Sequence, residues 1–295
     1  MNTNARRGTE PTQTVPSVEV HGEILPALGF GTWLLYGQEA ADAVRDAIEI
    51  GYRHLDTARI YENEYSIGLG IHESGIARAE LFLTTKIYAS AYWSRSTQVR
   101  RVRRGGLRCA AEDSCMRLDT DYLDLLLLHW PSREVSLEET MEEMVQLKDE
   151  GVTRHIGVSN FPTGMLHQAC ELAPVFCNQV EYHPFLSQER LLDAARELGI
   201  AVVAHSPLAR GKVFEDETLT RIGARHGKSA AQVALRWLVE QPNVCAVPTA
   251  TTSQWRQDNW NIFDFALSSE DTAEIDALPK DVRIADGPFA PDWEA

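Results

Sequence analysis

The sequence predicts an α/β fold, a (β/α)8 TIM barrel with an N-terminal β-hairpin, and three observations support this prediction. A short apolar run, a turn and an amphipathic stretch follow one another about eight times along the chain. The order strand, helix, strand favours a parallel sheet, and the number of repeats favours closure of that sheet. The length of 295 residues, 44% of them hydrophobic, suits one large core.

The elements are expected in the following order. The hairpin lies in VEVHGEILPAL, with its turn at His21-Gly22. The barrel strands are predicted at 28–33, 54–58, 81–87, 122–130, 155–160, 177–182, 201–206 and 245–250. Helices are predicted between them at, for example, 39–50, 137–150, 187–198 and 229–240. A doubly wound sheet is the competing architecture, but the first strand-helix turn has no G-x-G-x-x-G, so a dinucleotide would have to be held in another way.

Composition narrows the class of protein. A formal charge of −15 argues against a nucleic-acid partner, and no apolar run is long enough to span a membrane. Residues 1–16 have no apolar core for a signal peptide, so we expect a disordered tail, a single domain over 17–295, and a cytoplasmic protein. The acidity, with five lysines against twenty-three arginines, indicates a salt-adapted or GC-rich prokaryotic source, and ordinary drift is the alternative. The five cysteines, without a CxxC pair, are expected to be reduced and buried.

Four polar residues stand at or just beyond the ends of successive predicted strands: Asp56, Tyr61, Lys86 and His129. Each has an ordinary explanation, since Asp56 could cap a helix, Lys86 could lie at an edge, and His129 could be a core histidine. Tyr61 could equally be a surface aromatic. Their joint placement on the carboxyl-terminal rim of a barrel, where ligands bind, favours an active site instead.

The chemistry of such a set is narrow. A neighbouring ammonium lowers the pKa of a phenol, which is the effect expected of Lys86 on Tyr61, and Asp56 would keep Lys86 charged. His129 could donate a hydrogen bond to a carbonyl oxygen beside Tyr61. The set contains no nucleophile paired with a base and no metal cage, so it fits protonation of an alkoxide after a nicotinamide has delivered a hydride.

From the hairpin to the C-terminal segment, the chain resembles the aldo-keto reductase family. The resemblance rests on GYRHLDTARIYENE (51–64), TTKI (84–87), DYLDLLLLHWP (121–131), GVSNF (157–161), NQVEYHP (178–184) and HSPLARG (205–211). Within the family the chain looks most like prokaryotic 2,5-diketo-D-gluconic acid reductases, which also reduce methylglyoxal. The resemblance implies a barrel that binds NADPH or NADH without a Rossmann motif, a small carbonyl substrate and a monomer.

The resemblance also implies roles for individual residues. Tyr61 is the implied general acid of the tetrad. The implied cofactor contacts are Ser159, Asn160 and Gln179 at the nicotinamide carboxamide, and His205, Ser206, Leu208, Thr249, Arg256 and Asn259 along the rest of the molecule. The implied walls of the carbonyl pocket are Trp33, Tyr88 and Trp130. With Tyr88 where many members have tryptophan, short aldehydes and α-dicarbonyls are the expected substrates.

Three departures from the family pattern matter. His205 replaces the tyrosine that stacks on the nicotinamide, so cofactor affinity is expected to be weaker and pH-dependent. In VPTATTSQWRQDN, Thr249 and Ala250 stand where the family motif that holds the 2′-phosphate has its lysine and serine, and Trp255 stands where that motif has its arginine. Arg256 is one residue out of register, a rotation of ~100° on a helix. Use of both cofactors, or a preference for NADH, therefore becomes credible.

The third departure is the basic segment RSTQVRRVRRGGLRCA (95–110), interpreted as a loop insertion before a helix resumes near Leu107. It is either an anion-attracting lip of the site or an extended, partly disordered loop. Two other functions can be considered for a chain of this fold. A cofactor-binding regulatory or structural homologue with little turnover is the alternative, whereas a phosphate-binding isomerase lacks the glycine-rich loop it would need.

Overall fold

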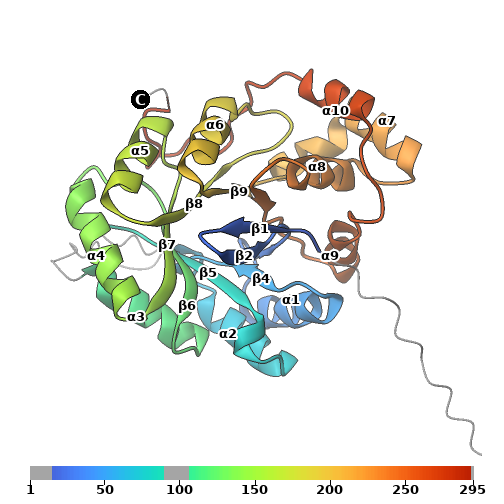
Figure 1. Cartoon of the computed structure of the whole chain (residues 1–295). Coiled ribbons are helices and arrows are strands. Elements are labelled where there is room, and N and C mark those ends of the chain that lie inside the picture. Colours follow the sequence, from blue (N-terminus) through green and yellow to red (C-terminus); the bar gives the residue numbers. More distant parts are fainter. Residues whose placement is uncertain (1–14, 90–105, 294–295) are drawn as a thin grey trace, which may run out of the picture.

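A computed structural model of the chain describes residues 15–89 and 106–293, and these form a closed (β/α)8 barrel (Figure 1). The strands are β1 Ser17–Val20, β2 Glu23–Pro26, β3 Phe30–Gly31, β4 His54–Asp56, β5 Phe82–Ile87, β6 Leu123–Leu128, β7 Thr153–Ser159, β8 Val175–Glu181, β9 Ala201–His205 and β10 Val244–Ala246. The α-helices are α1 Gly37–Ile50, α2 Glu64–Ser74, α3 Gly106–Leu118, α4 Leu137–Asp149, α5 Thr163–Leu172, α6 Glu189–Leu198, α7 Glu217–His226, α8 Ala230–Val239, α9 Ser253–Trp260 and α10 Ser269–Asp276. Short 3-10 helices are η1 Arg59–Tyr61, η2 Arg78–Glu80 and η3 Ala209–Glu215.

The eight strands β3 to β10 are parallel and pair in chain order. The first and last strands meet through a parallel bridge between Leu28 and Ala246, so the sheet closes. Glycine makes this closure possible, because a Cβ at Gly31 would lie 2.6 Å from the carbonyl oxygen of Val247. The sequence prediction of a closed barrel is therefore confirmed, and the doubly wound alternative is excluded.

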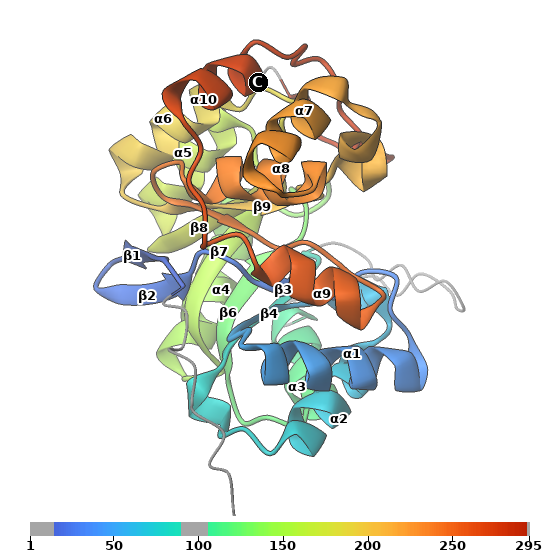
Figure 2. The same cartoon turned by 90° about the vertical axis from the view of Figure 1, so that its right-hand side faces the viewer.

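The hairpin β1–β2 covers one end of the barrel, as Figures 1 and 2 show. Its turn is at His21-Gly22, as predicted, and both residues have positive φ, 51° and 83°, as a two-residue hairpin turn requires. Val18, Val20 and Leu25 are buried in one cluster with barrel-interior side chains of β6, β8, β9 and β10. Because the hairpin fills the amino-terminal end, ligands have access only from the opposite end, where the strands terminate.

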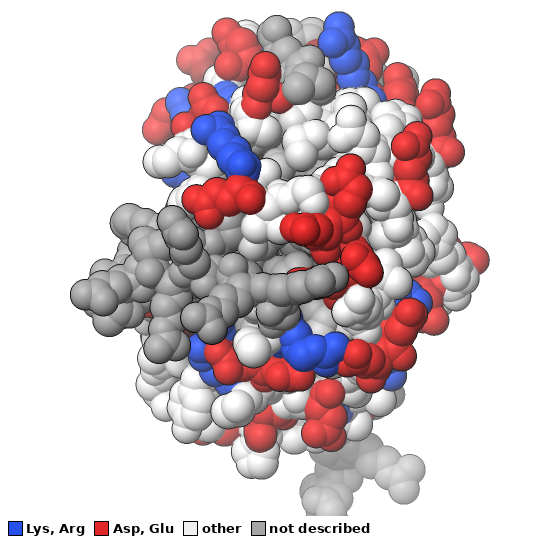
Figure 3. Space-filling view, turned by 90° about the vertical axis from the view of Figure 1, so that its left-hand side faces the viewer, with Lys and Arg blue, Asp and Glu red and all other residues white. Residues whose placement is uncertain are grey.

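The predicted element boundaries agree with the structure to within a few residues. The helix expected to resume near Leu107 begins at Gly106, whereas most of the basic segment and of the N-terminal tail lies outside the described residues. The prediction for the cysteines is confirmed only in part: all five are free, and Cys115, Cys177 and Cys245 are buried. It was wrong for Cys109 on α3, which is exposed, and for Cys170, which is half-buried. Acidic side chains outnumber basic ones on the face drawn in Figure 3, in keeping with the net charge. In the part of the chain that the structure describes, the helices are too short or too polar to cross a membrane.

Candidate active site

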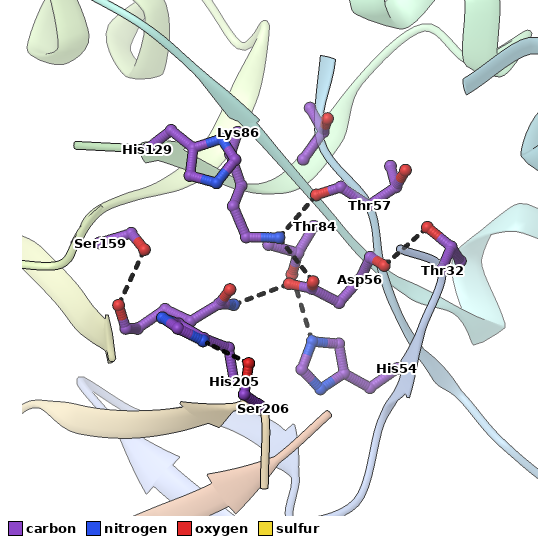
Figure 4. Close-up of polar contacts among 12 residues, drawn as sticks. Thr32, His54, Asp56, Thr57, Thr84, Lys86, His129, Ser159, His205 and Ser206 are labelled. Carbon is purple, nitrogen blue, oxygen red and sulfur yellow. Dashed lines mark hydrogen bonds and ion pairs between the residues drawn. The ribbon is translucent and has the colours of Figure 1, made fainter. Parts of the chain in front are cut away.

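A buried ion pair lies at the centre of the carboxyl-terminal end of the barrel. The ammonium of Lys86, at the end of β5, donates to Asp56 Oδ1 over 2.5 Å and to the carbonyl oxygen of Thr57 over 2.8 Å (Figure 4). Asp56 ends the neighbouring strand β4, and both side chains are almost completely buried. Burial lowers the pKa of Lys86, and the Asp56 carboxylate opposes that shift. The Asp56 carboxylate therefore favours the charged form of Lys86 in a site where burial disfavours it.

Tyr61 and His129 lie beside this pair. The Lys86 Nζ atom is 5.2 Å from the centroid of the Tyr61 ring, and the Tyr61 and His129 rings pack edge to face with centroids 6.0 Å apart. Burial, helped by the neighbouring charge of Lys86, holds the pKa of His129 well below its ordinary value. A neutral imidazole is left, and its buried Nδ1 has no hydrogen-bond partner among the described residues. The four predicted residues thus come together at one place.

The prediction that Lys86 lowers the pKa of the Tyr61 hydroxyl was wrong. Burial raises the pKa of Tyr61, and the nearby charge of Asp56 raises it further. The reason is that Asp56 neutralises the Lys86 ammonium at short range, so burial dominates at the phenol. Tyr61 therefore holds its proton at neutral pH, as a proton donor must.

The three residues predicted for a carboxamide form one network with the ion pair. Gln179 Nε2 donates to Asp56 Oδ2 over 2.7 Å, and the Ser159 hydroxyl donates to the Gln179 backbone carbonyl over 2.8 Å. Asn160 Nδ2 donates to Ser159 Oγ and to the carbonyl oxygen of His129, both over 3.0 Å. Asn160 has φ 62°, a left-handed conformation that asparagine tolerates, where the chain turns at the end of β7. Paired amides and a hydroxyl at one point fit the donor and acceptor pattern of a nicotinamide carboxamide.

His205 lies at the end of β9, next to this network. Its Nε2 is 3.0 Å from Asn160 Oδ1 and its Nδ1 is 3.2 Å from the hydroxyl of Ser206. Burial lowers the pKa of His205 to about 4, so the imidazole stays neutral at neutral pH. This lowered pKa moves any charge on His205 into the acid range, and the pH dependence of cofactor affinity stays a prediction. Beyond Ser206, Leu208 directly precedes η3, and its carbonyl accepts from the Gly211 amide.

The segment predicted to meet a 2′-phosphate lies at the start of α9. Thr249 is half-buried, Trp255 is 56% exposed in the first turn, and Asn259 is buried further along the helix. The Arg256 guanidinium is held away from solvent, with Nε donating to Asp46 Oδ2 over 2.5 Å and Nη1 donating to the Ala250 carbonyl over 3.1 Å.

Asp46 belongs to α1, and its other oxygen accepts from the hydroxyl of Ser253 over 2.9 Å. A carboxylate thus stands between the helix start and the arginine beside it. Asp46 could not be predicted from the sequence, because its partner Arg256 is far away along the chain.

The three predicted pocket residues lie at different places. The centroid of the Tyr88 ring is 5.1 Å from that of the His129 ring. Trp130 directly follows His129 in the sequence. Trp33, by contrast, lies at the surface, with the Arg210 guanidinium 4.8 Å from its ring.

The sequence analysis did not assign Phe289 or Trp293, whose rings are 5.6 Å from Tyr88 and 6.1 Å from Trp130. An aromatic pair in a C-terminal segment is the signal that could have identified them.

The arrangement suits proton donation to a bound carbonyl oxygen. Residues 15–89 and 106–293 contain no cluster of histidine, cysteine and carboxylate side chains that could hold a metal ion. The site instead offers a phenol, a neutral imidazole and an ion pair. In a buried site of low dielectric constant, hydrogen bonds and charges of this kind interact more strongly with a developing charge than they do in water.

Comparison with known proteins identifies the family. The family model described as "Aldo/keto reductase family" matches residues 27–280. This chain belongs to the aldo/keto reductase family. It is accordingly an oxidoreductase, from a family that generally uses NADPH or NADH.

Similar reductases cover nearly the whole chain. The glyoxal reductase of Bacillus subtilis (strain 168) is 40% identical over 282 residues, which are 94% of this chain and 98% of that protein. The methylglyoxal reductase DkgB of Escherichia coli O157:H7 is 36% identical over 276 residues, 92% of this chain and 99% of that protein. A crystal structure assigned as a 2,5-diketo-D-gluconic acid reductase B has a TM-score of 0.89 and 41% identity, covering 96% of this chain and 99% of that one.

Proposed function

We propose that this aldo/keto reductase transfers a hydride from a nicotinamide cofactor to small aldehydes, α-oxoaldehydes or keto-sugar acids, with Tyr61 as the general acid. The observation that carries the proposal is the buried Asp56–Lys86 pair with Tyr61 and His129 packed against it. The names of the similar reductases support the substrate class.

The geometry suggests what each side chain does. The cofactor, when bound, supplies the hydride, and Ser159, Asn160 and Gln179 would hold its carboxamide. His129 orients the carbonyl oxygen of the substrate by a hydrogen bond from its neutral ring. Tyr61 keeps its proton until negative charge develops on that oxygen, and then donates it. The Lys86 ammonium, held by Asp56 with its Nζ atom 5.2 Å from the centroid of the Tyr61 ring, would offset only part of the negative charge that remains on the phenolate.

Cofactor preference follows from the other end of the site. Thr249 and Trp255 bring no positive charge to the start of α9, and Asp46 holds the guanidinium of Arg256. The carboxylate of Asp46 would also repel a 2′-phosphate near Ser253. We therefore propose that the enzyme accepts NADH as well as or better than NADPH.

The test is the initial rate of oxidation of NADPH and of NADH, in parallel, with methylglyoxal as the substrate. Tyr61→Phe removes the proton donor and is expected to lower kcat by about 10²–10⁴-fold. The affinity for cofactor, measured by quenching of protein fluorescence, should stay the same. Full activity in this variant would refute the role of Tyr61, whereas cofactor binding without turnover would favour a regulatory or structural homologue.

A further inference from the structure

The C-terminal segment 281–293, here called the strap, is tied to the end of β8 and to the loop that follows it. Leu186 and Asp281 form an antiparallel bridge, and the Val282 amide donates to the Phe185 carbonyl over 3.0 Å. These backbone contacts fix where the strap starts. They do not by themselves determine its course beyond Val282.

Glu181, the last residue of β8, holds the next part of the strap. Its side chain is completely buried, and its oxygens accept from the Ile284 amide over 2.7 and 3.0 Å and from the Ala285 amide over 2.5 Å. His183 Nε2 lies 2.8 Å from Glu181 Oε1, and because His183 Nδ1 accepts from the Phe185 amide, Nε2 carries the proton. Burial alone would raise the pKa of Glu181, but the bonds from His183, Ala285 and Ile284 outweigh it and lower that pKa. The ionised carboxylate of Glu181 therefore holds the strap through hydrogen bonds from two of its backbone amides.

The strap carries its aromatic side chains to the catalytic residues. The ring centroids of Phe289 and Tyr88 are 5.6 Å apart, and those of Tyr88 and His129 are 5.1 Å apart. The centroid of the His129 ring is in turn 6.0 Å from that of Tyr61. The next residue, Ala290, accepts a hydrogen bond from Arg133 over 2.8 Å. A continuous row of rings thus runs from the strap to the proton donor.

Phe289 forms the outer end of this row. Its side chain is 41% exposed, and its ring packs at a tilt of 59° against that of Tyr88. A ring in this position limits how large a group can stand beside Tyr88 on the substrate carbonyl. The position of the strap therefore sets how closely the Phe289 ring approaches Tyr88.

We propose that Glu181 is a positioning residue for substrate specificity: by holding the strap amides at 284 and 285, it keeps Phe289 against Tyr88 and narrows the pocket for short oxoaldehydes. Glu181 itself does not touch the substrate. The inference rests on the proposed function, because it assigns the size selectivity of that same site.

A structural role alone would have a different signature. If a substitution at Glu181 only lowered the stability of the fold, kcat/KM would fall by the same factor for all substrates. Release of the strap would instead change KM by a factor that depends on the size of the substrate. The row of rings ends at His129 and Tyr61, which are held by other elements, so the chemical step should stay intact. The discriminating quantity is the ratio of kcat/KM for methylglyoxal to kcat/KM for a bulky aldehyde such as 4-nitrobenzaldehyde.

The first variant is Glu181→Gln, which keeps the shape but removes the charge and one acceptor. We expect KM for methylglyoxal to rise about tenfold, with kcat nearly unchanged, as for loss of uniform binding. KM for 4-nitrobenzaldehyde should stay the same or fall. The matched control is Glu197→Gln, an exposed glutamate on α6, which should behave like the parent enzyme.

The second variant, Ala285→Pro, removes one strap amide and leaves the buried Glu181–His183 pair in place. It stays informative if Glu181→Gln fails to fold, and it should shift the specificity ratio in the same direction. Trypsin cleavage after the half-buried Arg283, followed by mass spectrometry, reports release of the strap without any turnover. Both variants should be cleaved faster than the parent.

Two outcomes are decisive. If the parent enzyme reduces both aldehydes, and the variants keep its specificity ratio and its cleavage rate, the role of Glu181 is refuted and the proposed function stands. If the parent turns over neither aldehyde, the proposed function fails, and unchanged cleavage of the variants would separately refute the grip of Glu181 on the strap.

Discussion

Arg256 lies beside the loop expected to meet the cofactor phosphate, but its guanidinium is committed to Asp46 and to the Ala250 carbonyl. Replacing Asp46 by alanine would free this guanidinium and remove a negative charge next to Ser253. We expect Asp46→Ala to shift the ratio of the NADPH and NADH dissociation constants about tenfold toward NADPH, since a gain of roughly 1.4 kcal/mol corresponds to that factor.

Quenching of protein fluorescence on titration with each cofactor measures these constants directly. Asp42→Ala is the matched control, because Asp42 is also on α1 but is exposed and pairs with Arg45. An unchanged ratio in Asp46→Ala would mean that Asp46 does not set the preference.

Individual residues of the site differ in how far the sequence alone could predict them. Asp56, Lys86 and His129 could be located because each ends an apolar run, and strand ends of a barrel share one rim. The ion pair between Asp46 and Arg256 could not be predicted, since it joins α1 to α9 through side chains that form no local sequence pattern. The rise in the pKa of Tyr61 was also out of reach, because burial depends on the packed structure.

At the scale of elements, β3 and the end of β10 approach so closely that only glycine fits at position 31. A methyl group there would collide with the Val247 carbonyl, which belongs to the backbone and cannot rotate away. We expect Gly31→Ala to lower the free energy of unfolding by about 1–3 kcal/mol, as overpacking does. It should also lower activity, because the adjacent Thr32 donates to the Asp56 carbonyl.

Urea unfolding followed by circular dichroism measures the effect on stability. Gly287→Ala serves as the control, since a Cβ at that position meets nothing within 4 Å. If Gly31→Ala is as stable as this control, closure of the barrel does not depend on the glycine.

The elements themselves were predictable because their signals are local. Alternation of apolar runs and amphipathic stretches gave eight barrel strands and the hairpin within a few residues of their observed ends. The exposed Cys109 shows the limit: a cysteine on a helix is buried or exposed according to which face packs, and α3 has only a weak apolar face. Nor could the strap be placed, since it is held by Glu181 and Arg133 rather than by a regular element.

At the scale of the whole molecule, the net charge of −15 is a property of the surface. Many of the arginines are paired with carboxylates, as in the cluster of Arg225 with Asp271 and Glu274, so the excess charge comes from the acidic side chains that remain. Repulsion among them is screened by salt. Adaptation to salt remains a prediction from composition.

Buried histidines make the whole molecule sensitive to acid. Burial lowers the pKa of His54 to about 4, against about 6.5 in an unfolded chain. Its contribution to stability is therefore complete above pH 6.5 and is lost as the pH falls toward 4, because the unfolded chain binds the proton first. For His54 alone this loss is roughly 3 kcal/mol, and His205 and His129 act in the same direction.

His54→Gln should therefore flatten the fall in unfolding free energy between pH 7 and pH 4.5, whatever it does to the absolute value at pH 7. The side chain touches Thr84 across the barrel interior, so some loss of stability at neutral pH is expected, and the slope is the diagnostic quantity. Urea titrations at several pH values give that slope. His72→Gln, on the exposed face of α2, should keep the parental slope, and an equal slope in both variants would show that His54 is not a source of the acid sensitivity.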